Sequence, residues 1–232
     1  MIDMTDCFVR AAAVAAGALV LAGCQTALHP DSSAWREVFA RDFSNVTFDT
    51  ADGWTWTEQG ELVARNGGTM LSKAEYENFT LDLAYVMEPA ANSGVFLYDT
   101  EHPDKKFEVQ ILDDNHPKYA TQKSNQRTGS IYSYHAANPV GSLPPGELNR
   151  MTVTCRGPHV KVVVNGVVSA DVDFRDWKSR FENPDGSPVR KKKCAERPHV
   201  GEIPWRGRIG LQGIHGGGRV FFKYVRIRED AE

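Results

Sequence analysis

Apolar and polar side chains alternate along most of this chain, and a period of two indicates β-strands rather than helices. In residues 78–87, NFTLDLAYVM, the apolar positions Phe79, Leu81, Leu83, Tyr85 and Met87 fall on one face of an extended segment. Residues 159–172, HVKVVVNGVVSADV, hold two β-branched runs joined by Asn165-Gly166. Asn-Gly supplies the positive φ angles of a type I′ turn, so this segment is predicted to form a β-hairpin.

Further strands are predicted at 54–57, 60–65, 94–99, 106–112, 129–134, 148–156, 207–212 and 219–229. The chain shows no long amphipathic helical pattern, and about ten strands without intervening helices favour an all-β fold. We therefore expect one domain over residues 36–230, an antiparallel β-sandwich or jelly roll. Residues 174–206 are irregular and rich in Pro and charge, with a short helix expected around DFRDWKSRF. A loop of this length inside a domain is more often functional than not.

The N-terminus differs in composition from the rest of the chain. Residues 11–22 are almost entirely Ala, Val, Leu and Gly, which is too short to span a bilayer comfortably and has the length of a signal-peptide hydrophobic region. The run ends in Leu21-Ala22-Gly23-Cys24, which resembles a bacterial lipobox. We expect residues 1–23 to be a signal peptide, Cys24 to be lipidated and residues 24–35 to be a tether. The alternative is an Ala-rich buried helix with a chance Cys.

This interpretation places the protein in the bacterial cell envelope, lipid-anchored to the outer membrane and facing the periplasm or the cell surface. Without residues 1–23, the 27 basic and 30 acidic residues fall to 26 and 28, and such a balance argues against a nucleic-acid surface. Cys155 and Cys194 then remain, and in an oxidising compartment they either pair or stay free. Neither lies in a CxxC or His-Cys cluster, so a zinc site has no support.

Residues 107–114, FEVQILDD, have polar residues within an otherwise apolar strand. Strict alternation sends Glu108, Gln110 and Leu112 to one face, and Val109, Ile111 and Asp113 to the other. This pattern fits a sheet whose second face forms a groove, although an edge strand with exposed charge has the same pattern. A β-bulge near Leu112 would reverse the alternation and bring Asp113 to the side of Glu108.

Five segments in order resemble the 3-keto-disaccharide hydrolase domain family over nearly all of residues 36–229. The segments are ANSGVF (91–96), FEVQILDD (107–114), RTGSIYSY (127–134), NRMTVTCRGPHVKVVVNG (149–166) and GRIGLQGIHGGGRVFFKYVRI (207–227). The resemblance implies a concanavalin A-like jelly roll that acts on sugars oxidised at carbon 3. The chain departs from the family pattern at Tyr98, where relatives often have a polar residue, and in the longer turn around His215.

A ketone at C3 acidifies the C2 hydrogen, so a base can remove it, the C1 substituent can leave, and water can add back. This route needs a base near C2, donors for the C3 oxygen and an acid for the leaving group. Glu108 is the expected base, and Asp113 or His215 the group that serves the leaving oxygen. The residues expected to bind the sugar are Asn92, Gln110, Arg127, Lys73, Tyr132 and Trp205.

Four of these binding residues have a structural alternative. Asn92 can form an Asx turn, Arg127 can pair with a surface acid, Lys73 can be merely exposed, and Tyr132 can belong to the core. We expect no cofactor, although DDNH at 113–116 offers oxygen ligands for Ca²⁺. Two other functions stay open: a lectin-like carbohydrate-binding lipoprotein, and a retaining laminarinase-like glycosidase. The latter would use Glu108 and Asp113 as its two carboxyls, roughly 5–5.5 Å apart.

Overall fold

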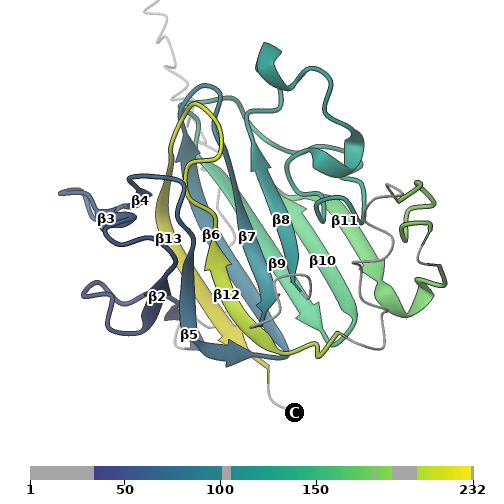
Figure 1. The fold of residues 1–232 in the computed structure, drawn as a ribbon, viewed down its shortest axis with the longest axis horizontal. Helices are drawn as coiled ribbons and strands as arrows, with labels where there is room; N and C mark the ends of the chain where they lie inside the picture. Colours follow the sequence, from purple (N-terminus) through teal and green to yellow (C-terminus); the bar gives the residue numbers. More distant parts are fainter. Residues whose placement is uncertain (1–33, 101–105, 180, 190–202, 231–232) are drawn as a thin grey trace, which may run out of the picture. The chain divides into compact units, whose positions relative to one another are not determined.

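Two antiparallel β-sheets make up the computed structural model, which describes residues 34–100, 106–179, 181–189 and 203–230 (Figure 1). The described residues form no α-helix, so the expected all-β sandwich is confirmed. The signal peptide, Cys24, almost all of the tether and Cys194 lie outside the described residues. No helix among the described residues has both the length and the apolar character needed to cross a membrane.

The larger sheet has eight strands in the order β11-β10-β9-β6-β13-β4-β3, with β1 paired to β13 beside β4. Its strands are β1 (Arg36–Glu37), β3 (Trp54–Trp56), β4 (Leu62–Ala64), β6 (Phe79–Met87), β9 (Asn149–Arg156), β10 (His159–Val164), β11 (Val167–Asp173) and β13 (Val220–Glu229). The predicted hairpin is confirmed as β10 and β11, with φ of 51° at Asn165 and 81° at Gly166. The predicted apolar face of 79–87 is buried along all of β6.

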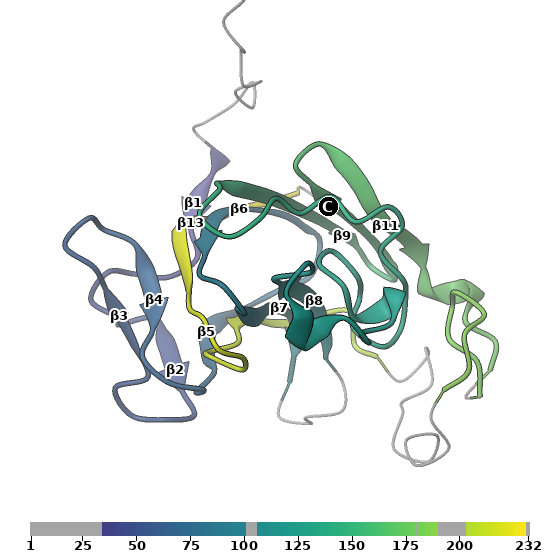
Figure 2. The same ribbon diagram turned by 90° about the horizontal axis from the view of Figure 1, so that it is seen from above.

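The smaller sheet has five strands in the order β2-β5-β12-β7-β8. Its strands are β2 (Val46–Phe48), β5 (Met70–Tyr76), β12 (Gly207–Leu211), β7 (Asn92–Asp99) and β8 (Phe107–Leu112). Figure 2 shows this sheet lying under the curved larger sheet, so that each sheet has one face turned to the other and one turned outward.

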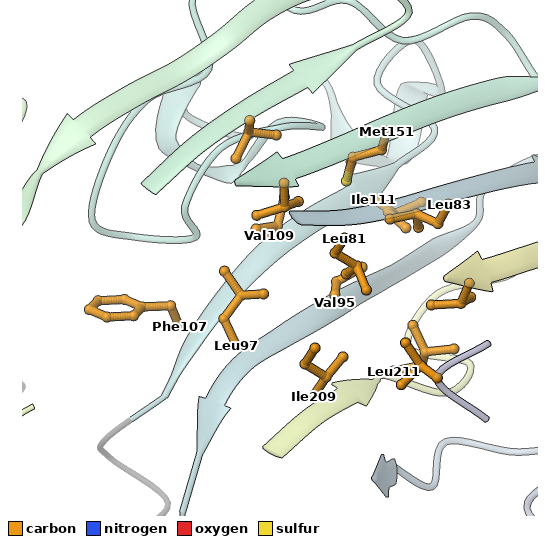
Figure 3. Close-up of a cluster of buried hydrophobic side chains, with 14 of the residues drawn as sticks. Leu81, Leu83, Val95, Leu97, Phe107, Val109, Ile111, Met151, Ile209 and Leu211 are labelled. Carbon is orange, nitrogen blue, oxygen red and sulfur yellow. The ribbon is translucent and has the colours of Figure 1, made fainter. Parts of the chain in front are cut away.

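Side chains from the two facing surfaces interleave to form the core (Figure 3). Alternate residues of β7 and β8 supply the smaller sheet's share, while β6 and β9 supply much of the larger sheet's share: Val95, Leu97, Phe107, Val109 and Ile111 against Leu81, Leu83, Met151 and Val153. Because β8 buries Phe107, Val109 and Ile111 inward, its intervening side chains must point outward. Packing of the core therefore fixes the outward direction of Glu108.

Two expectations about local structure were wrong. Residues 129–134 do not form a six-residue strand: the segment makes a single bridge to β8, at Val109 and Ile131, before Ser133 turns the chain with φ of 63°. The backbone N–H of Gly129 donates to the Gln110 carbonyl, and that of Tyr132 to the Glu108 carbonyl. Where a short helix was expected around DFRDWKSRF, the described residues form only a 3₁₀ turn, η4 (Phe174–Asp176).

Candidate active site on the outer face of the smaller sheet

The candidate site is the outward face of β7, β8 and β12. Glu108 pairs with Phe96 across the two strands, Gln110 with Gly94, and Leu112 with Asn92. Gly210 of β12 pairs with Phe96 on the other side of β7. Glycines at two neighbouring strands leave room over the backbone, and neighbouring side chains lie across both of them.

Glu108 lies across Gly94. Its Cγ and Cδ are 2.8 and 3.0 Å from the point that a β-carbon on residue 94 would occupy, so only glycine accommodates this conformation. Loss of water around the carboxyl raises its pKa from 4.5 to about 7, and nearby Lys106 partly opposes the rise. No described residue donates a side-chain hydrogen bond to this carboxylate. A carboxyl with this pKa is suited to accept a proton at neutral pH.

Lys106 precedes β8 and lies on the same side as Glu108. Its Nζ is 4.0 Å from the centre of the Phe96 ring and 3.1 Å from Oδ2 of Asp99. Asp99 is only 4 % exposed and also accepts a 2.8 Å bond from Arg208. Sequence reasoning missed Lys106 and Gly94, although the period of two already places Lys106 on the face of Glu108.

The Gln110 side chain is buried, and it contacts the loop around Gln126, which follows β8 in the chain. Its Nε2 is 3.5 Å from the Gln126 carbonyl oxygen, and its Oε1 accepts from the Ile111 backbone N–H. The Gln126 amide donates to the Tyr132 hydroxyl at 3.0 Å. Gln110 and Tyr132 thus belong to one network beside β8, with Tyr132 half-buried at its outer end.

Asp113 follows the end of β8. The pairing of β7 with β8 runs without a register shift from Asn92 to Leu97, so no bulge turns Asp113 toward Glu108. The Asp113 carboxylate, 4 % exposed, accepts the Ala90 backbone N–H at 2.9 Å, and its own N–H donates to the Ala91 carbonyl. The structure gives Asp113 the position of a turn-stabilising acid at the end of the sheet.

His215 and Asn92 lie next to each other at one end of the site. The His215 backbone N–H donates to the Asn92 carbonyl at 3.1 Å, and the His215 side chain is exposed. Asn92 is two residues from Gly94 on the outer face of β7, about 6–7 Å along the strand. Among the sequence-predicted residues, the structure therefore groups Glu108, Gln110, Asn92 and His215.

Three other predicted residues have partners elsewhere. Arg127 donates to the backbone carbonyls of Asp114 and Ala120, at 2.6 and 3.5 Å. Lys73 of β5 is exposed and donates to the Ser44 carbonyl at 2.8 Å. Trp205 stacks on Phe107 at 5.9 Å between ring centres, and Phe107 faces the core.

Within the part of the chain that the structure describes, no group of three or more His, Cys, Asp or Glu side chains could hold a metal ion. Within DDNH, the Asp114 carboxylate accepts from the Thr128 backbone and the Ser142 hydroxyl, and His116 caps a short 3₁₀ turn. Cys155 is a free, buried thiol in β9.

Comparison with known proteins adds to this geometry. A curated 3-keto-disaccharide hydrolase of Bacteroides thetaiotaomicron is 29 % identical over an alignment of 197 residues that covers 73 % of this chain and 64 % of that protein. The chain therefore spans less than two thirds of that relative's length.

Solved structures show the same fold. A Parabacteroides distasonis protein named as a glycosyl hydrolase has 33 % identity and a TM-score of 0.77, with 84 % of this chain and 99 % of that one covered. A second such protein of the same organism, at 21 % identity, has a TM-score of 0.65 over 85 % of this chain and 95 % of its own. The model of the 3-keto-alpha-glucoside-1,2-lyase-like domain matches residues 31–228. By this match the chain belongs to the 3-keto-alpha-glucoside-1,2-lyase-like domain family.

Proposed function

We propose that the protein cleaves the glycosidic bond of 3-keto-glycosides, among them 3-keto-disaccharides, by proton abstraction, elimination and hydration. The observation on which this rests is Glu108, a carboxyl with a pKa of about 7 on the outward face of the smaller sheet. Membership of the family and the hydrolase name of the curated relative support a sugar substrate of this kind.

In the first step, Glu108 takes the proton from C2. The electron pair of the C2–H bond becomes a C2–C3 double bond, and the carbonyl pair moves onto the C3 oxygen. An ordinary glutamate, with a pKa near 4.5, would be a weaker base than this desolvated one. A base with a pKa near neutrality is ionised often enough at pH 7 and still accepts a proton readily.

In the second step, the C3 carbonyl re-forms, C1 and C2 become doubly bonded, and the C1–O bond breaks. The leaving alkoxide takes a proton from an acid, a role that we assign to His215, which is exposed and whose backbone contacts Asn92. Asp113 is already occupied by the Ala90 N–H. Water then adds to C1 and gives its released proton back to the acid that protonated the leaving group, while protonated Glu108 returns its proton to C2, which yields the free 3-keto-sugar.

The proposal is tested by incubating the purified protein with a 3-keto-disaccharide and, separately, with its unoxidised parent. We expect 3-keto-glucose to be released from the oxidised sugar alone. Equal cleavage of both sugars would favour an ordinary retaining glycosidase, and binding without turnover would favour a lectin-like role. Either result would overturn the proposal.

The base assignment is tested with Glu108→Gln, which should lower the turnover rate by at least about 100-fold and leave folding intact. Glu75→Gln is the matched control, since Glu75 is an exposed glutamate of β5 in the same sheet and pairs with Arg206. Full activity in Glu108→Gln would refute the role of Glu108.

A further inference from the structure

Lys106 has the position that a stabiliser of negative charge needs in this reaction. We propose that Lys106 is a catalytic residue. Its ammonium group donates a hydrogen bond to the C3 oxygen as that atom becomes an oxyanion. The inference rests on the proposed function, because it assigns a role within that same chemistry.

The placement of Lys106 relative to the base follows from the strand register. The ammonium group lies 4.0 Å above the Phe96 ring, while the Glu108 carboxyl lies over Gly94. Phe96 and Gly94 are neighbours on the outer face of β7, about 6–7 Å apart. Lys106, just before β8, and Glu108, within it, thus both lean onto β7 in the same direction, two residues apart.

That spacing suits a keto-sugar. The C3 oxygen and the C2 hydrogen of a ketone are about 3 Å apart, and the base and the donor each stand roughly 3 Å from their target atom. The base and the donor are therefore expected within about 6–8 Å of each other, on the same side of the sugar.

Lys106 is also held in place. Asp99, itself nearly buried and bonded to Arg208, takes one side of the ammonium group at 3.1 Å, and the Phe96 ring supports another. The Lys106 side chain remains 28 % exposed. A lysine fixed on two sides with part of its surface open is preorganised for a third, anionic partner.

Three other residues that were expected to bind the sugar make structural contacts instead. Gln110 is covered and contacts the Gln126 carbonyl, Arg127 donates to two backbone carbonyls, and Lys73 donates to the Ser44 carbonyl. Of Lys106, Arg127 and Lys73, Lys106 is the cation that lies beside Glu108.

The experiment compares Lys106→Gln, Lys106→Arg and the control Lys161→Gln, a lysine of β10 in the larger sheet that pairs with Asp171. Two rates are measured with a 3-keto-disaccharide deuterated at C2: release of 3-keto-glucose, and washout of deuterium into water. Washout reports enolate formation whether or not the C1 bond breaks.

We expect Lys106→Gln to lower kcat and the washout rate by about 100-fold while KM changes by less than about threefold. Lys106→Arg should recover part of both rates, and Lys161→Gln should match the wild type. Wild-type rates in Lys106→Gln, or a rise in KM alone, would overturn the role of Lys106. If the role of Lys106 is overturned in this way while Glu108→Gln is inactive in the same assay, the proposed function still stands.

A wild-type protein that gives neither product nor washout would instead overturn the proposed function, and the role of Lys106 with it. Unfolding midpoints of all variants distinguish a loss of chemistry from a loss of folding. A fall in activity that parallels a fall in the Lys106→Gln midpoint, without recovery in Lys106→Arg, would likewise refute the inference.

Discussion

Glu108 of β8 lies flat across Gly94 of β7, with its Cγ 2.8 Å from the position that a β-carbon at residue 94 would take. The two residues are not direct cross-strand partners, since Glu108 pairs with Phe96. The glutamate therefore reaches diagonally along the sheet, and the absent side chain at residue 94 makes room for it. This contact fixes where the carboxyl is and how little water surrounds it.

Replacing Gly94 by Ala should displace Glu108. The new methyl group would overlap the Glu108 side chain, which must rotate toward solvent, so its pKa should fall toward 4.5. We expect turnover of a 3-keto-disaccharide to drop by about 10–100-fold, because a base shifted by an ångström loses much of its effect.

Gly68→Ala provides the comparison for this variant. Its β-carbon would lie 2.8 Å from the Asp49 carboxylate and from Thr50 Cβ, just before β5, which is three strands away from β8 in the same sheet. It should lower stability without moving the Glu108 pKa, measured by carboxyl NMR. An unchanged Glu108 pKa in Gly94→Ala would contradict the packing argument.

The pH dependence of kcat/KM should report Glu108. Its carboxyl must be ionised to act as a base, so kcat/KM should rise with pH, tenfold per unit, and level off above about 7. A profile recorded from pH 5 to 8 checks this expectation. A flat profile over that range, with the protein folded throughout, would exclude Glu108 as the base.

Glu108 should also make folding stability depend on pH, independently of any activity. Its folded-state pKa is raised to about 7 from 4.5, so the folded state holds a proton that the unfolded state releases between these values. The stabilisation of the protonated form is complete below about pH 4.5 and is lost as pH rises through 7.

Glu108→Gln removes this dependence. The variant should match the wild type at pH 4 and exceed it by about 1–3 kcal/mol in free energy of unfolding at pH 8. Urea unfolding at the two pH values is the measurement. Equal stabilities at pH 8 would mean that the carboxyl is well hydrated.

A second buried acid, Asp82, should matter for stability only. It is fully buried on β6, where Arg150, Arg226 and Thr152 donate hydrogen bonds to it. Burial alone would raise its pKa, but the two arginines outweigh this effect and lower it. Its stabilisation is therefore present at neutral pH and lost as pH falls through the lowered pKa.

Asp82→Asn should cost about 1–3 kcal/mol in free energy of unfolding at pH 7, since it leaves two arginines without their anion. Asp171→Asn, at an exposed pair with Lys161, should change stability by less than about 0.5 kcal/mol. Urea unfolding of both variants tests the contrast, and a neutral Asp82→Asn would refute it.

Local signals predicted much of the fold. The Asn165-Gly166 turn and the period-two apolar face of β6 depend on neighbouring residues alone, so the sequence predicts them directly. Strand β5, MLSKAEY, was not predicted because its inward positions include Ser72. That side chain is buried yet satisfied, donating to the Ala74 carbonyl and accepting from the Ile209 N–H. Its partners are known only once the sheet is built.

The candidate site was predictable in direction but not in detail. Alternation along β8 was enough to turn Glu108 outward with Gln110, but the contact with Gly94 depends on the register between β7 and β8. The lysine was missed for the same reason, because its neighbours Phe96 and Asp99 belong to the other strand. Gln110 is buried through a contact with Gln126 in a loop, and the period of two along β8 does not predict that contact.

Residues 129–132 hydrogen-bond to the side of β8 that faces away from β7, through Gly129, Ser130 and Tyr132. β8 is last in its sheet, and a bare outermost strand is a template on which other polypeptides can add and aggregate. The flanking loop occupies that template. A second molecule would have to peel the loop away before it could pair there, so the strand that holds Glu108 is shielded from intermolecular β-sheet growth.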